Sequence, residues 1–156
     1  MNDPYSKLRP MPPTPDDELC HCVAVSELYI AYKIGTNPIY CLTCNCEVPP
    51  ERLKFEEQLA ESIAFWNSIY GALYQLWLGS GSYEEWSRER LLDPKGEANL
   101  DGLRLARKLS SIARTYYLWF SESNDQGETA CPVCGREMAE KPPGRFKACE
   151  KCMVLK

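Results

Sequence analysis

The sequence CPVCGREMAEKPPGRFKACEKC, residues 131–152, holds two cysteine pairs whose spacing constrains the local structure more strongly than any other part of the chain. A Cys-x-x-Cys turn directs two sulfur atoms to one point. Pro132 and Gly135 favour such a turn, because proline fixes φ and glycine tolerates positive φ. Fourteen residues separate Cys134 from Cys149, and a Lys-Pro-Pro-Gly sequence midway predicts a reversal of the chain. We therefore expect a hairpin that gathers four thiols at one end.

Four thiolates at this spacing are the ligand set that zinc prefers in a tetrahedral structural site. Residues 131–152 resemble a zinc ribbon, a motif that occurs in many otherwise unrelated proteins. The resemblance implies structural zinc but carries no particular function. The expected ligands of this site are Cys131, Cys134, Cys149 and Cys152.

A second cysteine group lies near the N-terminus and is less regular. The sequence Cys41-Leu-Thr-Cys44-Asn45 again predicts a metal-binding turn, with asparagine at the position of positive φ. The earlier half, Cys20-His21-Cys22, is one residue shorter than the usual pair. The segment between the two halves is rich in β-branched and aromatic residues and contains a Gly-Thr-Asn-Pro turn signal, so it predicts a β-hairpin.

Nine cysteines then divide into two groups of four and one spare thiol. The predicted N-terminal ligands are Cys20, Cys22, Cys41 and Cys44. Cys46 is the spare, and the expected content is two Zn²⁺ per chain. Alternatives remain open at this point: His21 or Cys46 in place of one ligand, no metal at the N-terminal group, or pairing of cysteines between the two groups.

Between the cysteine groups the pattern is helical. Apolar residues recur at helical spacing over 49–79, and Ser82 with Glu85 predicts the cap of a short helix ending at Leu92. Asn99 is a candidate N-cap for a third helix over 100–120. The apolar stripe of that helix is Leu105, Leu109, Ile112, Tyr116 and Trp119, and its opposite face carries Arg104, Arg107, Lys108 and Arg114.

These features predict a mainly α fold, in which a small helical bundle carries two zinc-stabilised β-hairpins. The predicted divisions are a flexible proline-rich tail over 1–18, a zinc-binding hairpin over 19–48, a helical domain over 49–120, a linker over 121–130 and a zinc ribbon over 131–156.

Composition restricts the partners and the compartment. The formal charge is −4, and two four-thiolate zinc sites would bring it to about −8, which disfavours non-specific attraction to nucleic acid. Basic residues outnumber acidic ones by 6 to 3 in 131–156. The first residues lack the apolar run of a signal peptide and no segment is apolar enough to span a membrane, so we expect a cytoplasmic protein that does not bind membranes.

No catalytic constellation is visible in the sequence. The single histidine, His21, lies inside a cysteine group, and no phosphate-binding or dinucleotide-binding glycine pattern occurs. The expected function is a non-enzymatic zinc-binding module that binds a protein partner. A nucleic-acid-binding zinc-ribbon protein is the first alternative. An enzyme that uses the irregular N-terminal zinc site is the second.

Overall fold

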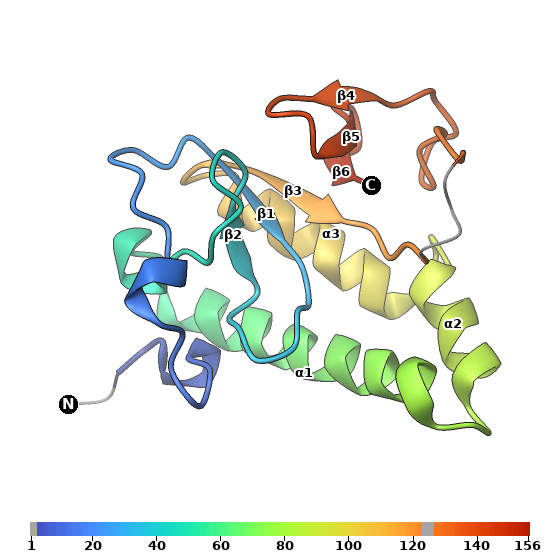
Figure 1. The fold of residues 1–156 in the computed structure, drawn as a ribbon, viewed down its shortest axis with the longest axis horizontal. Coiled ribbons are helices and arrows are strands. Elements are labelled where there is room, and N and C mark those ends of the chain that lie inside the picture. The colour runs from blue at the N-terminus through green and yellow to red at the C-terminus, as the bar shows by residue number, and fades with distance from the viewer. Residues whose placement is uncertain (1–2, 123–126) are drawn as a thin grey trace.

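Six strands form one mixed sheet with three α-helices packed on it in the computed structural model, which describes residues 3–122 and 127–156 (Figure 1). The predicted mainly α-helical bundle is therefore wrong, and the fold is α/β. The strands are β1 (Glu27–Ile30), β2 (Ile39–Cys41), β3 (Arg114–Leu118), β4 (Ala139–Lys141), β5 (Phe146–Cys149) and β6 (Val154–Leu155). The helices are α1 (Glu57–Gly79), α2 (Glu84–Leu92) and α3 (Glu97–Leu109), with 3₁₀ turns at Ser6–Leu8, Asp16–Glu18 and Pro50–Arg52.

The sheet joins the two cysteine groups through one central strand. Its order is β2-β1-β3-β6-β5-β4. β1 and β2 form an antiparallel hairpin, as do β4 and β5, so both predicted hairpins are present. β3 lies between β1 and β6 and is parallel to both. The two hairpins are therefore parts of a single sheet rather than appendages of a helical bundle.

The third predicted helix, 100–120, is divided between a helix and this central strand. α3 ends at Leu109, and Ser110 closes the following turn by accepting a hydrogen bond from the Thr115 amide at 3.0 Å. The side chains of Tyr116 and Tyr117 are both fully buried, on opposite faces of β3. A strand buried on both faces has apolar residues in an unbroken run. Some of the apolar residues in such a run also fall at helical spacing, which is why this segment was predicted as part of a helix.

The first helix is also shorter than the predicted 49–79. Lys54 has φ of +52°, a left-handed conformation that interrupts the chain between the 3₁₀ turn and α1. The helix ends at Gly79 as predicted. The N-cap of α2 is Tyr83, which makes no side-chain cap hydrogen bond, so the predicted cap by Ser82 and Glu85 is wrong. In the turn before the helix, Ser80 accepts a hydrogen bond from the Tyr83 amide, and Glu84 accepts one from the Gly81 amide.

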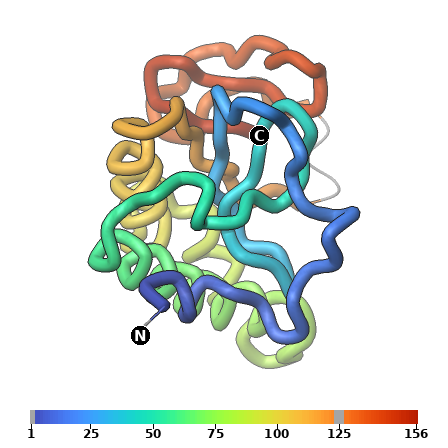
Figure 2. The backbone as a smooth tube through the Cα atoms, turned by 90° about the vertical axis from the view of Figure 1, so that its left-hand side faces the viewer, coloured from blue at the N-terminus to red at the C-terminus, as the bar shows by residue number. Residues whose placement is uncertain are grey.

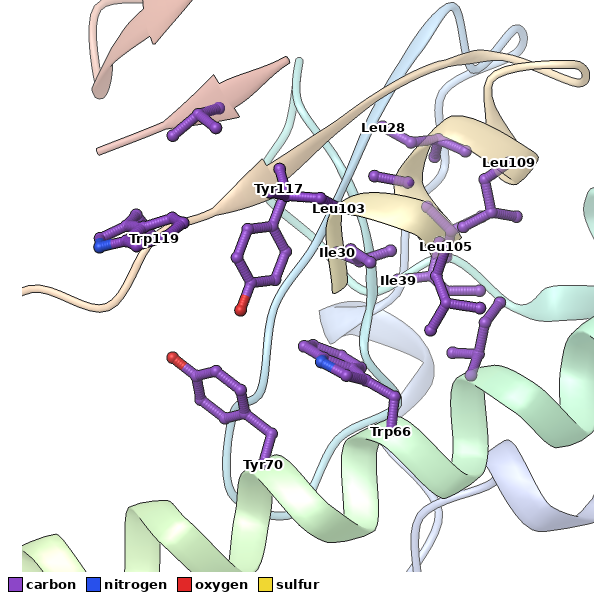
Figure 3. Close-up of a cluster of buried hydrophobic side chains, with 14 of the residues drawn as sticks. Leu28, Ile30, Ile39, Trp66, Tyr70, Leu103, Leu105, Leu109, Tyr117 and Trp119 are labelled. Atoms are coloured by element: carbon purple, nitrogen blue, oxygen red, sulfur yellow. The ribbon is translucent and has the colours of Figure 1, made fainter. Parts of the chain in front are cut away.

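The helices cover one face of the sheet, and the main core lies between the helices and that face (Figure 3). Tyr117 of β3 points towards α1 and donates a hydrogen bond to Asn99 at 2.8 Å. Asn99 is fully buried and donates to the carbonyl of Asp93 at 2.8 Å, so it secures the end of α2 instead of capping α3 as predicted. Gly102 allows the close approach of α3 to the sheet, because an added Cβ would lie 2.2 Å from the Tyr117 ring.

A second, smaller core lies on the other face, where the curved sheet brings its two hairpins together. Tyr29 of β1 and Phe146 of β5 meet edge to face at 5.3 Å, although two strands separate them in the sheet. Lys141 at the end of β4 forms an ion pair with Glu27 at 2.9 Å. Figure 2 shows the red C-terminal segment beside the blue and cyan N-terminal hairpin.

The N-terminal segment predicted as a tail packs against the rest of the molecule. From the predicted tail, Tyr5 donates a hydrogen bond to the Phe55 carbonyl at 2.8 Å, and Leu8 is buried against the core. In the predicted linker, residues 123–126 lie outside the described residues. In the described part of the chain, α1 is the longest helix, and neither it nor any other helix has the length and apolar character needed to cross a membrane.

Candidate metal centres

The structure gathers the eight predicted cysteines into two groups of four. In each group the four Sγ atoms all lie within 4.8 Å of one another, and two of the four residues are buried. The N-terminal group is Cys20, Cys22, Cys41 and Cys44, and the C-terminal group is Cys131, Cys134, Cys149 and Cys152. Each group can hold one metal ion.

The sulfur spacing fits a tetrahedral zinc ion. Four Zn–S bonds of about 2.3 Å place neighbouring sulfurs about 3.8 Å apart. The Sγ atoms of Cys22 and Cys41 are 3.9 Å apart, and those of Cys134 and Cys149 are 3.7 Å apart. A disulfide would need about 2.05 Å, and all nine cysteines are free thiols.

In the C-terminal ribbon, residues 131–156, the first cysteine pair is closed by its own backbone. The Cys131 amide donates to the Arg136 carbonyl at 2.8 Å, and the Gly135 amide donates to the Cys131 carbonyl at 2.8 Å. Gly135 has φ of +72°, as predicted for this turn. Met153 takes the corresponding position after Cys152 with φ of +57°.

The second half of the N-terminal ribbon, residues 19–48, repeats this geometry. The Cys41 amide donates to the Cys46 carbonyl at 3.0 Å, and the Asn45 amide donates to the Cys41 carbonyl at 2.9 Å. Asn45 has φ of +62°, and its side chain accepts a hydrogen bond from Tyr29. Cys46 thus matches the position of Arg136 and lies outside the four-thiol group.

The first half of the N-terminal ribbon is closed differently. Cys20-His21-Cys22 is too short for the same turn, and Arg52 donates hydrogen bonds to the carbonyls of both Cys20, at 2.5 Å, and Cys22. The imidazole Nε2 of His21 lies 2.7 Å from the Asp16 carbonyl, outside the group. Arg52 was missed by the sequence analysis because it is 30 residues from Cys22, and no local pattern connects them.

The two candidate centres are connected through side chains of the C-terminal ribbon. Arg145 lies 3.4 Å from the carbonyls of both Leu42 and Thr43, which belong to the turn between Cys41 and Cys44. Lys141, already paired with Glu27, also lies 3.3 Å from Glu150, which stands between Cys149 and Cys152 in the sequence. These contacts join the two ribbons in the folded chain.

The thiols of each group cannot all ionise without a cation. A backbone hydrogen bond from Arg136 lowers the pKa of Cys134 to about 7. In contrast, burial and then a hydrogen bond with Cys134 raise the pKa of Cys152 to about 12. A hydrogen bond with Cys44, followed by burial, likewise raises the pKa of Cys22 to about 12. Four thiolates this close together would repel one another. A dication at the centre would offset that repulsion and hold all four thiols as thiolates.

The predicted basic face of the third helix is only partly a helix face. Arg104, Arg107 and Lys108 are exposed on α3, and Arg104 is paired with Asp101 at 2.5 Å. Arg114 is not on the helix. It belongs to β3 and pairs with Glu150.

Comparison of the chain with protein-family models, with curated proteins and with solved structures gave no match.

Proposed function

We propose that the protein is a non-enzymatic, zinc-stabilised module that binds a protein partner and holds two structural Zn²⁺ ions. One observation carries the proposal: each group supplies four protein thiols at tetrahedral spacing. A catalytic zinc site keeps one position open for water or substrate, whereas four thiolates close the coordination shell. The enzyme alternative depended on an open N-terminal site, and the four thiols gathered there count against it.

The surroundings of the C-terminal ribbon favour a protein partner over nucleic acid. Three of its basic side chains are engaged within the molecule. Lys141 pairs with Glu27, Lys156 pairs with Glu128 at 2.9 Å, and Arg145 lies against backbone carbonyls of the N-terminal ribbon. Phosphate contacts need cations that are free to replace counterions, so these three side chains are less available for them.

Elemental analysis of the purified full chain tests the metal part of the proposal. We expect two zinc ions per chain. One zinc per chain would remove the N-terminal site from the proposal, and none would overturn it.

Fluorescence anisotropy with mixed-sequence DNA and RNA tests the choice of partner. Nucleic-acid binding is the second candidate because Arg107 and Lys108 are exposed near the C-terminal end of α3. We expect no binding that persists at physiological salt, where weak phosphate contacts are screened. Salt-resistant binding that is abolished by reversing the charges of Arg107 and Lys108 would favour nucleic acid instead.

A further inference from the structure

A groove runs between α1 and α3, which lie beside each other in opposite directions (Figure 1). Its two hollows have cavity volumes of about 460 and 660 Å³, and both are lined by Gln58, Ser62 and Lys108, so they form one groove. Volumes of this size are within the range of binding sites. From Phe55 to Phe65 the lining extends for about 15 Å at 1.5 Å per residue, or about three helical turns.

The groove has exposed apolar side chains at both ends. At one end Phe65 is 68% exposed, beside the buried side chains of Trp66 and Leu105. At the other end Ile112 is 42% exposed, and it also lines a neighbouring hollow together with Val23, which is fully exposed. Exposed apolar residues that line one depression are typical of an interaction surface.

Three cations line the wider hollow and are free to meet a partner. Lys54, Arg107 and Lys108 are all exposed, and none of them forms an ion pair with any residue that the structure describes. They differ in this respect from the three engaged cations of the C-terminal ribbon. A partner that seeks positive charge therefore finds it here.

Three carboxylates also line the groove, but two of them are already neutralised. Asp101 pairs with Arg104 at 2.5 Å. Glu61 pairs with Lys7, also at 2.5 Å. Both pairs lie along the narrower hollow, at the Phe65 end, so that end is close to neutral.

The wider hollow has a local excess of positive charge. Its one carboxylate, Glu56, stands against three free cations, and the neighbouring Glu57 lines neither hollow. The whole chain carries a formal charge of −4, but at physiological salt charges more than about 8 Å apart are largely screened. An acidic group inside the groove therefore interacts mainly with the groove's own cations.

This combination fits an amphipathic helix better than a nucleic acid. Such a helix lays an apolar stripe into a groove, and acidic side chains beside the stripe would meet the free cations. Bases instead stack on aromatic rings or guanidinium planes. Ile112 and Val23 are aliphatic, so at this end of the groove they match the apolar side chains of a protein.

We propose that the groove between α1 and α3 binds an acidic, amphipathic helix of a partner protein. The acidic residues of that helix lie at the Ile112 end, beside Lys54, Arg107 and Lys108, and an apolar anchor packs on Phe65. This inference rests on the protein-binding function proposed above, and it names the surface and the chemistry of the partner.

Fluorescence anisotropy of a labelled peptide with the zinc-loaded full chain tests the proposal. The probe is a designed four-turn amphipathic helix with leucines along one face and glutamates on the flanks of that face. Its matched control has lysine in place of every glutamate. The acidic peptide should bind at least about tenfold more tightly than the basic one, and its Kd should rise with salt concentration.

Charge reversal in the groove tests the position of the acidic residues. Arg107→Glu combined with Lys108→Glu should raise the Kd of the acidic peptide by at least about tenfold. Lys95→Glu combined with Lys147→Glu is the matched control, because it changes the net charge equally at two exposed positions outside the groove. This control should leave the Kd within about twofold of the wild type.

Truncation of the apolar anchor tests the other end of the groove. Phe65→Ala should raise the Kd about tenfold, since a well-packed aromatic anchor is typical of a binding hot spot. Ile34→Ala is its control, because Ile34 is 59% exposed and lines neither hollow. Circular dichroism and zinc content show whether each variant is folded.

Four results would overturn the proposal: no binding of the acidic peptide, equal binding of the basic peptide, equal effects of the two charge-reversal pairs, or a Kd unchanged by Phe65→Ala. Displacement of the acidic peptide by mixed-sequence DNA that itself binds more tightly would assign the groove to nucleic acid and would also overturn it. A chain that holds two zinc ions and ignores the acidic peptide refutes this inference alone, whereas a chain without zinc refutes the function proposed above.

Discussion

The two ribbons of this protein hold the same four-thiol arrangement by different means. In the C-terminal ribbon both cysteine pairs are complete Cys-x-x-Cys turns, each followed by a residue with positive φ, Gly135 or Met153. In the N-terminal ribbon only the Cys41–Cys44 pair has this form. The shorter Cys20–Cys22 pair is held by the guanidinium of Arg52, which comes from outside the hairpin. A turn of the right length closes itself, whereas a shorter one needs support from another part of the fold.

The ribbons also differ in what they contribute to the core. The N-terminal ribbon supplies Leu28, Ile30 and Ile39 to the cluster beneath the helices, and β1 pairs directly with β3. The C-terminal ribbon contributes Met138 and Val154 to that cluster. We therefore expect the N-terminal ribbon to be more closely coupled to folding of the whole chain.

Removing one ligand from each centre should give the largest effect. Cys41→Ser and Cys131→Ser should each lower the zinc content from two to one per chain. The binding free energy of a structural zinc, about 10–16 kcal/mol in small zinc-finger peptides, is comparable to the whole stability of a domain. Cys41→Ser should abolish the cooperative unfolding transition of the chain, whereas Cys131→Ser should leave the helices and β1–β3 folded.

Zinc analysis and thermal melting followed by circular dichroism measure both effects. Cys46→Ser is the matched control, since Cys46 lies beside the N-terminal centre but outside its four thiols. It should retain two zinc ions. Loss of zinc from this variant, with retention in Cys20→Ser, would contradict the ligand assignment.

Removing the guanidinium of Arg52 should have an intermediate effect, a loss of zinc affinity at the N-terminal centre alone. Arg52→Ala should weaken zinc binding at the N-terminal centre by about 10–100-fold and leave the C-terminal centre unchanged. Arg52→Lys should fall in between, because an ammonium group lacks the planar fork that reaches two carbonyls. Chelator competition with cobalt-substituted protein resolves the two affinities. Arg136→Ala is the control, an exposed arginine next to the C-terminal centre, and an equal loss in this variant would remove the special role of Arg52.

Changing the turn residue should give the smallest effect. Gly135→Ala keeps the backbone at φ of +72°, and an added Cβ meets nothing within 4 Å, so the cost is conformational, about 1 kcal/mol. The melting temperature should fall by about 2–4 °C. Asn45→Ala should cost more, because it also removes the acceptor of the Tyr29 hydrogen bond. Equal shifts for the two variants would show that this hydrogen bond contributes nothing to stability.

The four-thiol groups follow from the sequence more directly than the fold does. The Cys-x-x-Cys turns, the exclusion of Cys46 and the positive φ at Gly135 depend on residues within a few positions of one another, and short-range turn geometry is encoded locally. The two halves of each four-thiol group are joined by a single hairpin, whose turn is also visible in the sequence. Tyr116 shows why the fold class was wrong. Its spacing from Leu109 and Ile112 fits a helix, but its side chain packs with Tyr29 and Leu155 on the face of the sheet away from the helices.

What the sequence determined by itself was therefore the two four-cysteine groups, the two hairpins and the end of α1 at Gly79, since each follows from local turn preferences and from the short hairpins that join the cysteine pairs. Only the tertiary structure decided that residues 114–118 form a strand, because β1 and β6 supply its hydrogen bonds from about 90 residues before it and about 40 after it. It also decided that Arg52 closes the short cysteine pair and that Arg145 reaches the other ribbon. These contacts depend on chain segments that meet only after folding, and no pattern within a single segment specifies them.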